Sequence, residues 1–212
     1  MKRTLVIAAA ALAAVAAPSA LGAPPAQTLT MSASTTAVKF GGSVTLSGKL
    51  AGGKFDDKRV TVRQDPFPVD SFANSGNATT NATGDWTLAV KPTANTRFQA
   101  RSGKADSPAV DVMVRPAISL KLSDRTPKRG QRVVFSGTLC PEHDGVAIAL
   151  QRRTAKGWRT VAKPVLADVP GATCSSYKRS LRVRRNSSYR TRFSGDADHV
   201  VGNSRVRRAA VH

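Results

Sequence analysis

A ten-residue pattern occurs twice in this chain of 212 residues, 89 positions apart. The first copy, at 41–50, reads GGSVTLSGKL, and the second, at 130–139, reads GQRVVFSGTL, with no gap between them. The match extends upstream at the same offset in three apolar pairs, Leu29 with Ile118, Met31 with Leu120, and Ala33 with Leu122. A self-match at a fixed offset indicates two copies of one structural unit, and apolar residues at every second position are typical of β-strands.

Short alternating runs continue through both copies, separated by clusters of Gly, Pro, Asn and Asp that are typical of turns. We expect strands near 28–34, 43–50, 59–64, 85–91, 96–101 and 109–115, and again near 118–123, 132–139, 146–152, 158–165, 176–184, 188–193 and 204–211. We interpret 74–85, which is polar and rich in Asn and Thr, as a loop. The segment 154–157 predicts a tight hairpin with Gly157 at a positive φ.

The fold class predicted from these runs is all-β. No segment after the first 25 residues has a sustained 3.6-residue pattern. Seven short strands in about 95 residues favour an antiparallel immunoglobulin-like β-sandwich over a closed barrel. Because the unit is repeated, we expect two such domains in tandem, at 23–115 and 116–212, with Pro116 at the boundary.

The first 22 residues are typical of a secretory signal peptide. A short basic start precedes an uncharged apolar run of about 13 residues, which is shorter than the roughly 20 that cross a bilayer. Ala20 and Gly22 form a small-x-small pair before Ala23, although cleavage after Ala23 is an alternative. With no cysteine for lipid attachment and no later membrane span, we expect a secreted protein, extracellular or held non-covalently at the cell envelope.

The net charge of +20 is unevenly distributed along the chain. Residues 23–115 have 11 Lys and Arg against 7 Asp and Glu, which leaves +4. Residues 116–212 have 20 against 6, which leaves +14. A field of this sign attracts nucleic acid, anionic lipid or acidic envelope polymers. The alternative is a solubilising charge that reflects an arginine-rich composition.

Several motifs resemble those of bacterial immunoglobulin-like repeat domains. They are the segment 193–199, Phe-Ser-Gly-Asp-Ala-Asp-His, the run 150–153 followed by 157–162, and the Gly-x-x-Val-x-apolar-Ser-Gly pattern of both copies. The resemblance covers nearly all of the second copy, and the first more loosely, because 101–106 lacks the Gly-Asp-Ala turn. It implies a spacer or adhesive module of a secreted or surface protein, with no shared catalytic residues.

Cys140 and Cys174 are the two cysteines of the chain, and both lie in the second copy. An exported chain with an even cysteine count favours one disulfide. In the immunoglobulin topology the second and fifth strands are antiparallel neighbours, which places the end of one beside the start of the other. We therefore predict a Cys140–Cys174 disulfide. A thiol metal site is not expected, because no His or Cys lies at ligand spacing.

The three histidines, His143, His199 and His212, are expected to be exposed turn or terminal residues. No nucleophile elbow or other catalytic signature accompanies them, so we predict no catalytic residue, no cofactor and no metal.

Two close acidic pairs deserve separate consideration, Glu142 with Asp144 and Asp196 with Asp198. Paired carboxylates serve in glycoside hydrolysis or bind calcium. An Asp in a turn more often accepts a hydrogen bond from its own backbone, and we favour that interpretation.

Arginines alternate with apolar residues in the last strands of the second copy. If those strands are neighbours, Arg190, Arg192, Arg205 and Arg207 form one exposed basic face, while the arginines of 181–184 lie on the opposite sheet. We name these four as candidate polyanion-binding residues. Nucleic-acid modules usually add exposed stacking aromatics, and most aromatics here are expected in the core. We therefore expect no sequence-specific nucleic-acid recognition.

The sequence thus predicts a non-enzymatic exported protein that serves as a structural or adhesive module at the cell envelope. The alternative is a polyanion- or carbohydrate-binding protein that uses the basic face of its second domain. The expected partners are an anionic envelope polymer or another surface protein. An exposed aromatic row would favour carbohydrate, and an arginine face without aromatics would favour polyanions.

Overall fold

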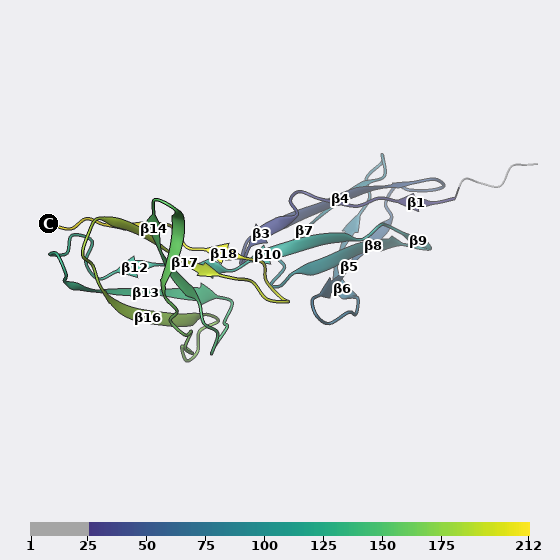
Figure 1. Ribbon diagram of the computed structural model, residues 1–212. Helices are drawn as coiled ribbons and strands as arrows, with labels where there is room; N and C mark the ends of the chain where they lie inside the picture. The colour runs from purple at the N-terminus through teal and green to yellow at the C-terminus, as the bar shows by residue number, and fades with distance from the viewer. Residues whose placement is uncertain (1–25) are drawn as a thin grey trace, which may run out of the picture.

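The computed structural model describes residues 26–212, so the proposed signal peptide lies outside the described residues. All regular structure in this range is β, with nineteen strands in four sheets (Figure 1). Within residues 26–212 there is no helix with the length and apolar character of a membrane span. The coarse prediction of an all-β chain is therefore confirmed.

The N-terminal half contains two sheets. Its strands are β1 (Thr28–Leu29), β2 (Ser32–Ala33), β3 (Ala37–Lys39), β4 (Val44–Ala51), β5 (Arg59–Pro66), β6 (Ala73–Thr79), β7 (Asp85–Val90), β8 (Thr96–Ser102), β9 (Ala105–Asp106) and β10 (Val110–Arg115). In one sheet β4 pairs with β1, β2 and β7. The other sheet has the order β3-β10-β8-β5-β6, with β9 on β8. All pairs are antiparallel except β3 with β10.

The C-terminal half repeats this plan. Its strands are β11 (Ala117–Ile118), β12 (Lys121–Leu122), β13 (Arg132–Cys140), β14 (Ala149–Thr154), β15 (Gly157–Ala162), β16 (Ser175–Arg182), β17 (Ser187–Phe193), β18 (Gly202–Asn203) and β19 (Arg207–Ala209). In one sheet β13 pairs with β11, β12 and β16. In the other the order is β15-β14-β17-β18, with β19 also on β17.

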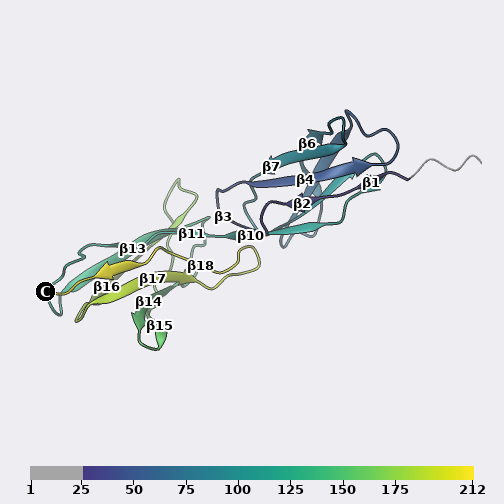
Figure 2. The ribbon, with the colours of Figure 1, turned by 90° about the horizontal axis from the view of Figure 1, so that it is seen from above.

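Each half has its own hydrophobic cluster. Trp86 and Phe98 lie in the first cluster, and Phe135, Tyr189 and Phe193 lie in the second, in line with the expectation that most aromatics lie in the core. The two clusters have no residue in common. Figures 1 and 2 show the two halves end to end, with the C-terminus at the far end from β1. The molecule is therefore elongated.

The glycine of the repeated Ser-Gly pair allows a close backbone contact in both halves. A Cβ on Gly48 would overlap the backbone carbonyl of Thr30, and a Cβ on Gly137 would overlap that of Ser119. Both carbonyls belong to the first chain segment of their half, which runs beside β4 or β13. Only glycine allows two backbones to approach this closely. The glycine of the repeated motif is therefore explained by this close packing of two backbone segments.

Replacing Gly137 with alanine should therefore destabilise the C-terminal half by about 3 kcal/mol, the upper end of the usual range for overpacking. The obstacle is backbone, which cannot move aside as a side chain can. Chemical denaturation measures the effect, and the adjacent Ser136→Ala is the matched control, with an expected change of less than about 0.5 kcal/mol. Equal midpoints for the two variants would contradict this explanation of the motif.

The segment 74–85 is not simply a loop, because its first part belongs to β6, which pairs antiparallel with β5 at the edge of the sheet. Its side chains are mostly exposed or half-buried, so the strand has no apolar alternation to reveal it. The predicted strands 28–34 and 118–123 are each broken into two short strands, and of the predicted strand 204–211 only the three residues of β19 are in a strand.

The predicted neighbours β13 and β16 are paired antiparallel, with Leu139 opposite Ser175. This register places Cys140 opposite Cys174, and the two form a disulfide. The predicted hairpin joins β14 to β15, with Thr154 opposite Gly157 and a φ of 110° at Gly157.

Candidate anion-binding face

The outer face of the β15-β14-β17 sheet is rich in arginine. Along β17, Tyr189, Thr191 and Phe193 are buried in the C-terminal half. Because side chains of a strand alternate, Arg190 and Arg192 lie on the opposite, outer face of the sheet. They form the centre of the basic surface, as predicted.

Arg207 does not share this face, and that part of the prediction is wrong. Strand β17 pairs Arg192 with Asn203 of β18, but pairs Tyr189 with Arg207 of β19. Between these pairs the register shifts by one residue, which moves every later side chain to the other face. Arg207 therefore lies on the side of buried Tyr189, where its Nε donates to the carbonyl of Leu120 at 3.0 Å.

Arg208 takes the predicted place instead. It lies opposite Ser188, which has the same parity along β17 as Arg190 and Arg192. Arg205 is exposed between β18 and β19 and lines a hollow with residues of the N-terminal half. Of the four predicted arginines, the structure thus brings only Arg190 and Arg192 together on this face.

Trp158 stands among the arginines. It lies opposite Arg153 across the β14–β15 hairpin. The guanidinium carbon of Arg190 is 4.5 Å from the centroid of the indole ring, and that of Arg153 is 5.6 Å from it. The Nε of Arg190 also donates to Oε1 of Gln151 at 2.9 Å. The ring and the amide hold the Arg190 guanidinium in place and leave its terminal nitrogens free to bind an anion.

We call Arg153, Arg190, Arg192 and Arg208 the arginine face. Burial, and then the charges of Arg192 and Arg153, lower the pKa of Arg190. A guanidinium still stays charged at neutral pH. The lowered pKa reflects first the partial burial of the guanidinium and then the two neighbouring positive charges.

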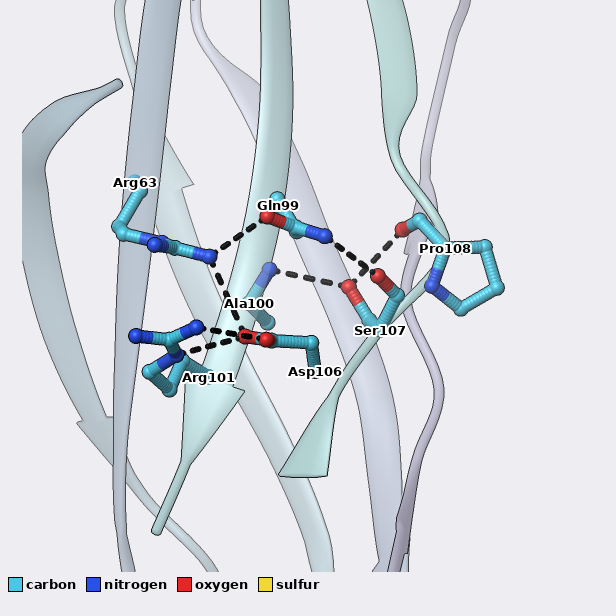
Figure 3. A network of polar contacts seen from close by, with 7 residues as sticks. All are labelled: Arg63, Gln99, Ala100, Arg101, Asp106, Ser107 and Pro108. Carbon is cyan, nitrogen blue, oxygen red and sulfur yellow. Dashed lines mark hydrogen bonds and ion pairs between the residues drawn. The ribbon is translucent and has the colours of Figure 1, made fainter. Parts of the chain in front are cut away.

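In the N-terminal half, several basic residues form ion pairs with aspartates. Figure 3 shows the guanidinium groups of Arg63 and Arg101 both directed at Asp106, with Arg101 donating to its two carboxylate oxygens at 2.7 Å each. The hydrogen bonds from Arg101 lower the pKa of Asp106. Among the described residues of the C-terminal half, in contrast, no Lys or Arg forms an ion pair with a carboxylate. The arginine face is therefore not neutralised.

A hollow of about 300 Å³ adjoins the arginine face. Its lining includes Gln151, Thr160, Lys163 and Arg192. Gln151, Thr160 and Arg192 supply hydrogen-bond donors from three strands, and Lys163, in the segment after β15, adds a further cation. The surface is thus an open strip, in which successive anionic groups of a polymer can be contacted.

Two of the histidines were wrongly expected to be exposed. The side chain of His143 is 8% exposed and that of His199 is 5% exposed, and both lie beside Asp196. The turn interpretation of Asp196 is confirmed, because its Oδ1 accepts the backbone N–H groups of Asp198 and His199 at 3.0 and 2.8 Å. His212, at the chain end, is exposed as expected.

Comparisons with known proteins add little to this picture. No family model matches the chain, and no curated protein matches it. One similar solved structure is described as "Crystal structure of tetra-tandem repeat in extending region of large adhesion protein". It is 15% identical, with a TM-score of 0.37, and the match covers 88% of this chain. The chain spans 50% of the length of that neighbour.

Proposed function

We propose that this chain is an exported, non-enzymatic module of two tandem immunoglobulin-like domains that binds an anionic polymer of the cell envelope. Two hydrophobic clusters with no common residue support the division at Pro116. The disulfide supports an oxidising compartment outside the cytosol. The elongated arrangement of the halves is suited to a structural or adhesive role (Figure 2).

The arginine face is the observation that carries the binding proposal. A guanidinium presents its N–H groups in a fork that matches a carboxylate, sulfate or phosphate, and charge-assisted bonds of this kind are roughly twice as strong as neutral ones. Trp158 and Gln151 hold Arg190 in place before an anion arrives. Less conformational entropy is then lost on binding.

A polymer fits this surface better than a small anion does. The face extends over β14, β17 and β19, and its hollow is open at the surface. A repeated charge along a chain can contact several arginines at once and release counterions from each contact. The single partly exposed Trp158 is held between arginines and is not part of an aromatic row. These features favour an acidic polysaccharide or a wall polymer over a neutral carbohydrate.

Changing the four residues of the arginine face to glutamine should weaken binding to heparin, used as a model acidic polysaccharide, by about thirtyfold to a hundredfold. This estimate takes about 0.5–0.7 kcal/mol for each exposed charge contact. Glutamine retains much of the side chain's length and polarity but removes the charge. Isothermal titration calorimetry of the full chain at low salt measures the effect.

A charge-matched control separates this face from the general positive field. Four exposed arginines on or beside the opposite sheet serve for it: Arg132, Arg179, Arg182 and Arg184. Their replacement by glutamine lowers the net charge equally, and we expect it to reduce affinity by less than about threefold. If both sets of substitutions weaken heparin binding equally, the proposal of a defined face is wrong.

A further inference from the structure

Three potential metal ligands meet where the two halves join. His143 lies in the turn after β13, and Asp196 and His199 lie in the loop between β17 and β18. Their ligand atoms all lie within 4.8 Å of one another. Nε2 of His143 is 3.0 Å from Oδ2 of Asp196, and Nδ1 of His199 is 3.8 Å from its Oδ1.

Both imidazoles are oriented by their other ring nitrogen. Nδ1 of His143 donates to the carbonyl of Pro141 at 2.9 Å, and Nε2 of His199 donates to the carbonyl of Thr93 at 2.8 Å. A carbonyl only accepts, so in the neutral ring the remaining nitrogen carries a lone pair. Both lone pairs then face Asp196. A ring nitrogen anchored to a backbone carbonyl is the usual support of a metal-binding histidine.

His199 provides an independent sign that something is bound here. Its Nδ1 is buried and has no hydrogen-bond partner among residues 26–212. A buried polar atom without a partner is costly and uncommon in native proteins. The nearest group in the cluster is the Asp196 carboxylate, whose Oδ1 is 3.8 Å from this nitrogen, and a carboxylate offers the neutral ring no donor. A cation between the three residues satisfies all three ligand atoms.

We propose that His143, Asp196 and His199 bind one divalent ion of the zinc class. Two imidazole nitrogens and one carboxylate oxygen are a donor set that Zn²⁺ prefers, with a tetrahedral arrangement and short bonds of about 2 Å. Ca²⁺ and Mg²⁺ need more oxygen ligands than this cluster offers. Asp196 is 39% exposed, so the fourth position opens to solvent and takes a water molecule.

The ion would hold the junction of the two halves together. The loop that carries His199 is already bound to the N-terminal half by two backbone hydrogen bonds. The backbone N–H of Asn95 donates to the carbonyl of Asp198 at 2.7 Å, and that of Val200 donates to the carbonyl of Val114 at 3.0 Å. His143, in contrast, belongs to the body of the C-terminal half beside the disulfide. An ion shared by His143 and the loop links these two parts and stiffens the elongated molecule.

Titration of the untagged, oxidised chain with Zn²⁺ tests the site. We expect one equivalent to bind, with changes in the ¹⁵N shifts of His143 Nε2 and His199 Nδ1 and not in those of His212. This measurement uses the wild-type chain and so does not depend on whether a variant folds. If Zn²⁺ at 100-fold excess moves neither nitrogen, or moves His212 alone, the site does not exist.

Three substitutions remove one ligand atom each but retain the local hydrogen bonds. His143→Asn places an amide near Nδ1, His199→Gln places one near Nε2, and Asp196→Asn retains Oδ1. Each should weaken Zn²⁺ binding at least about tenfold, the low end for disturbing a metal site. Asp198→Asn, in the same loop, and His212→Asn are controls with unchanged affinity. Unchanged affinity in all three ligand variants would overturn the assignment.

Hydrogen exchange tests the stiffening of the junction. Added Zn²⁺ should slow exchange of the Asn95 and Val200 amides, which donate across the junction, by about the same factor in each. Amides within β13 and β16 are the internal reference and should not change. Binding of Zn²⁺ without slower exchange at Asn95 and Val200 would show that the ion does not stiffen the junction.

Discussion

Replacing Phe135 with alanine is expected to lower the free energy of unfolding of the C-terminal half by about 3–5 kcal/mol. Phe135 is 0% exposed, and its ring centroid is 4.7 Å from that of Tyr189. The substitution removes both the buried apolar surface and this ring contact, and it leaves a cavity. Because small domains are stable by only about 5–15 kcal/mol, much of the stability of this half would be lost.

Chemical denaturation followed by circular dichroism measures this loss. Phe98→Ala, at a fully buried position of the other cluster, is the matched control. Since the clusters have no residue in common, Phe98→Ala should destabilise the N-terminal half and leave the C-terminal transition nearly unchanged. A single transition that both substitutions shift equally would contradict the two-domain proposal.

Removing the disulfide by replacing Cys140 and Cys174 with alanine should destabilise the C-terminal half by roughly 3–4 kcal/mol. The bridge closes a loop with a sequence separation of 34 residues, which includes β14 and β15. Without the bridge the unfolded chain gains the conformational entropy that this closure restricts. The β13–β16 hydrogen bonds remain in the folded state, so the effect arises mainly in the unfolded state.

The measurement compares the denaturation midpoints of the oxidised wild type and the double alanine variant. Single alanine variants are less suitable, because each leaves a reactive free thiol. The midpoint of the N-terminal half is the internal control and should not move. Equal stability of the two proteins, or two titratable thiols in the wild type purified without reductant, would contradict the prediction.

The strands and the two clusters could be predicted because burial imposes a period of two on the sequence. Val44 and Leu46 in one copy, and Val133 and Phe135 in the other, are all buried at every second position, and the residues between them, Thr45 and Val134, are not. Strand β6 has no such signal, since it lies at a sheet edge and buries little. Its hydrogen bonds come from β5, whatever its side chains are.

The arginine face shows where alternation fails as a guide. A one-residue shift between β18 and β19 exchanges Arg207 for Arg208, and nothing in the alternating pattern marks where a strand changes register. Trp158 was within reach of prediction. The two-residue loop of the predicted hairpin fixes Trp158 opposite Arg153.

The histidine cluster depends on tertiary structure. His143 and His199 are 56 positions apart in sequence, each in a polar turn that by itself suggests exposure. His199 is buried by contact with the N-terminal half, through Thr93, and His143 by packing edge-on against Phe193. Neither contact is encoded near the histidine that it buries.

The most direct test of the proposed function is the salt dependence of heparin binding by the full chain. If the arginine face binds the polymer, log K should fall linearly with log salt concentration, with a slope of nearly one per neutralised charge. The four-glutamine face variant should then have a slope smaller by about three to four, and the charge-matched variant of the opposite sheet should retain the wild-type slope. Identical slopes for all three proteins would contradict the proposal and leave the arginines as a solvated surface.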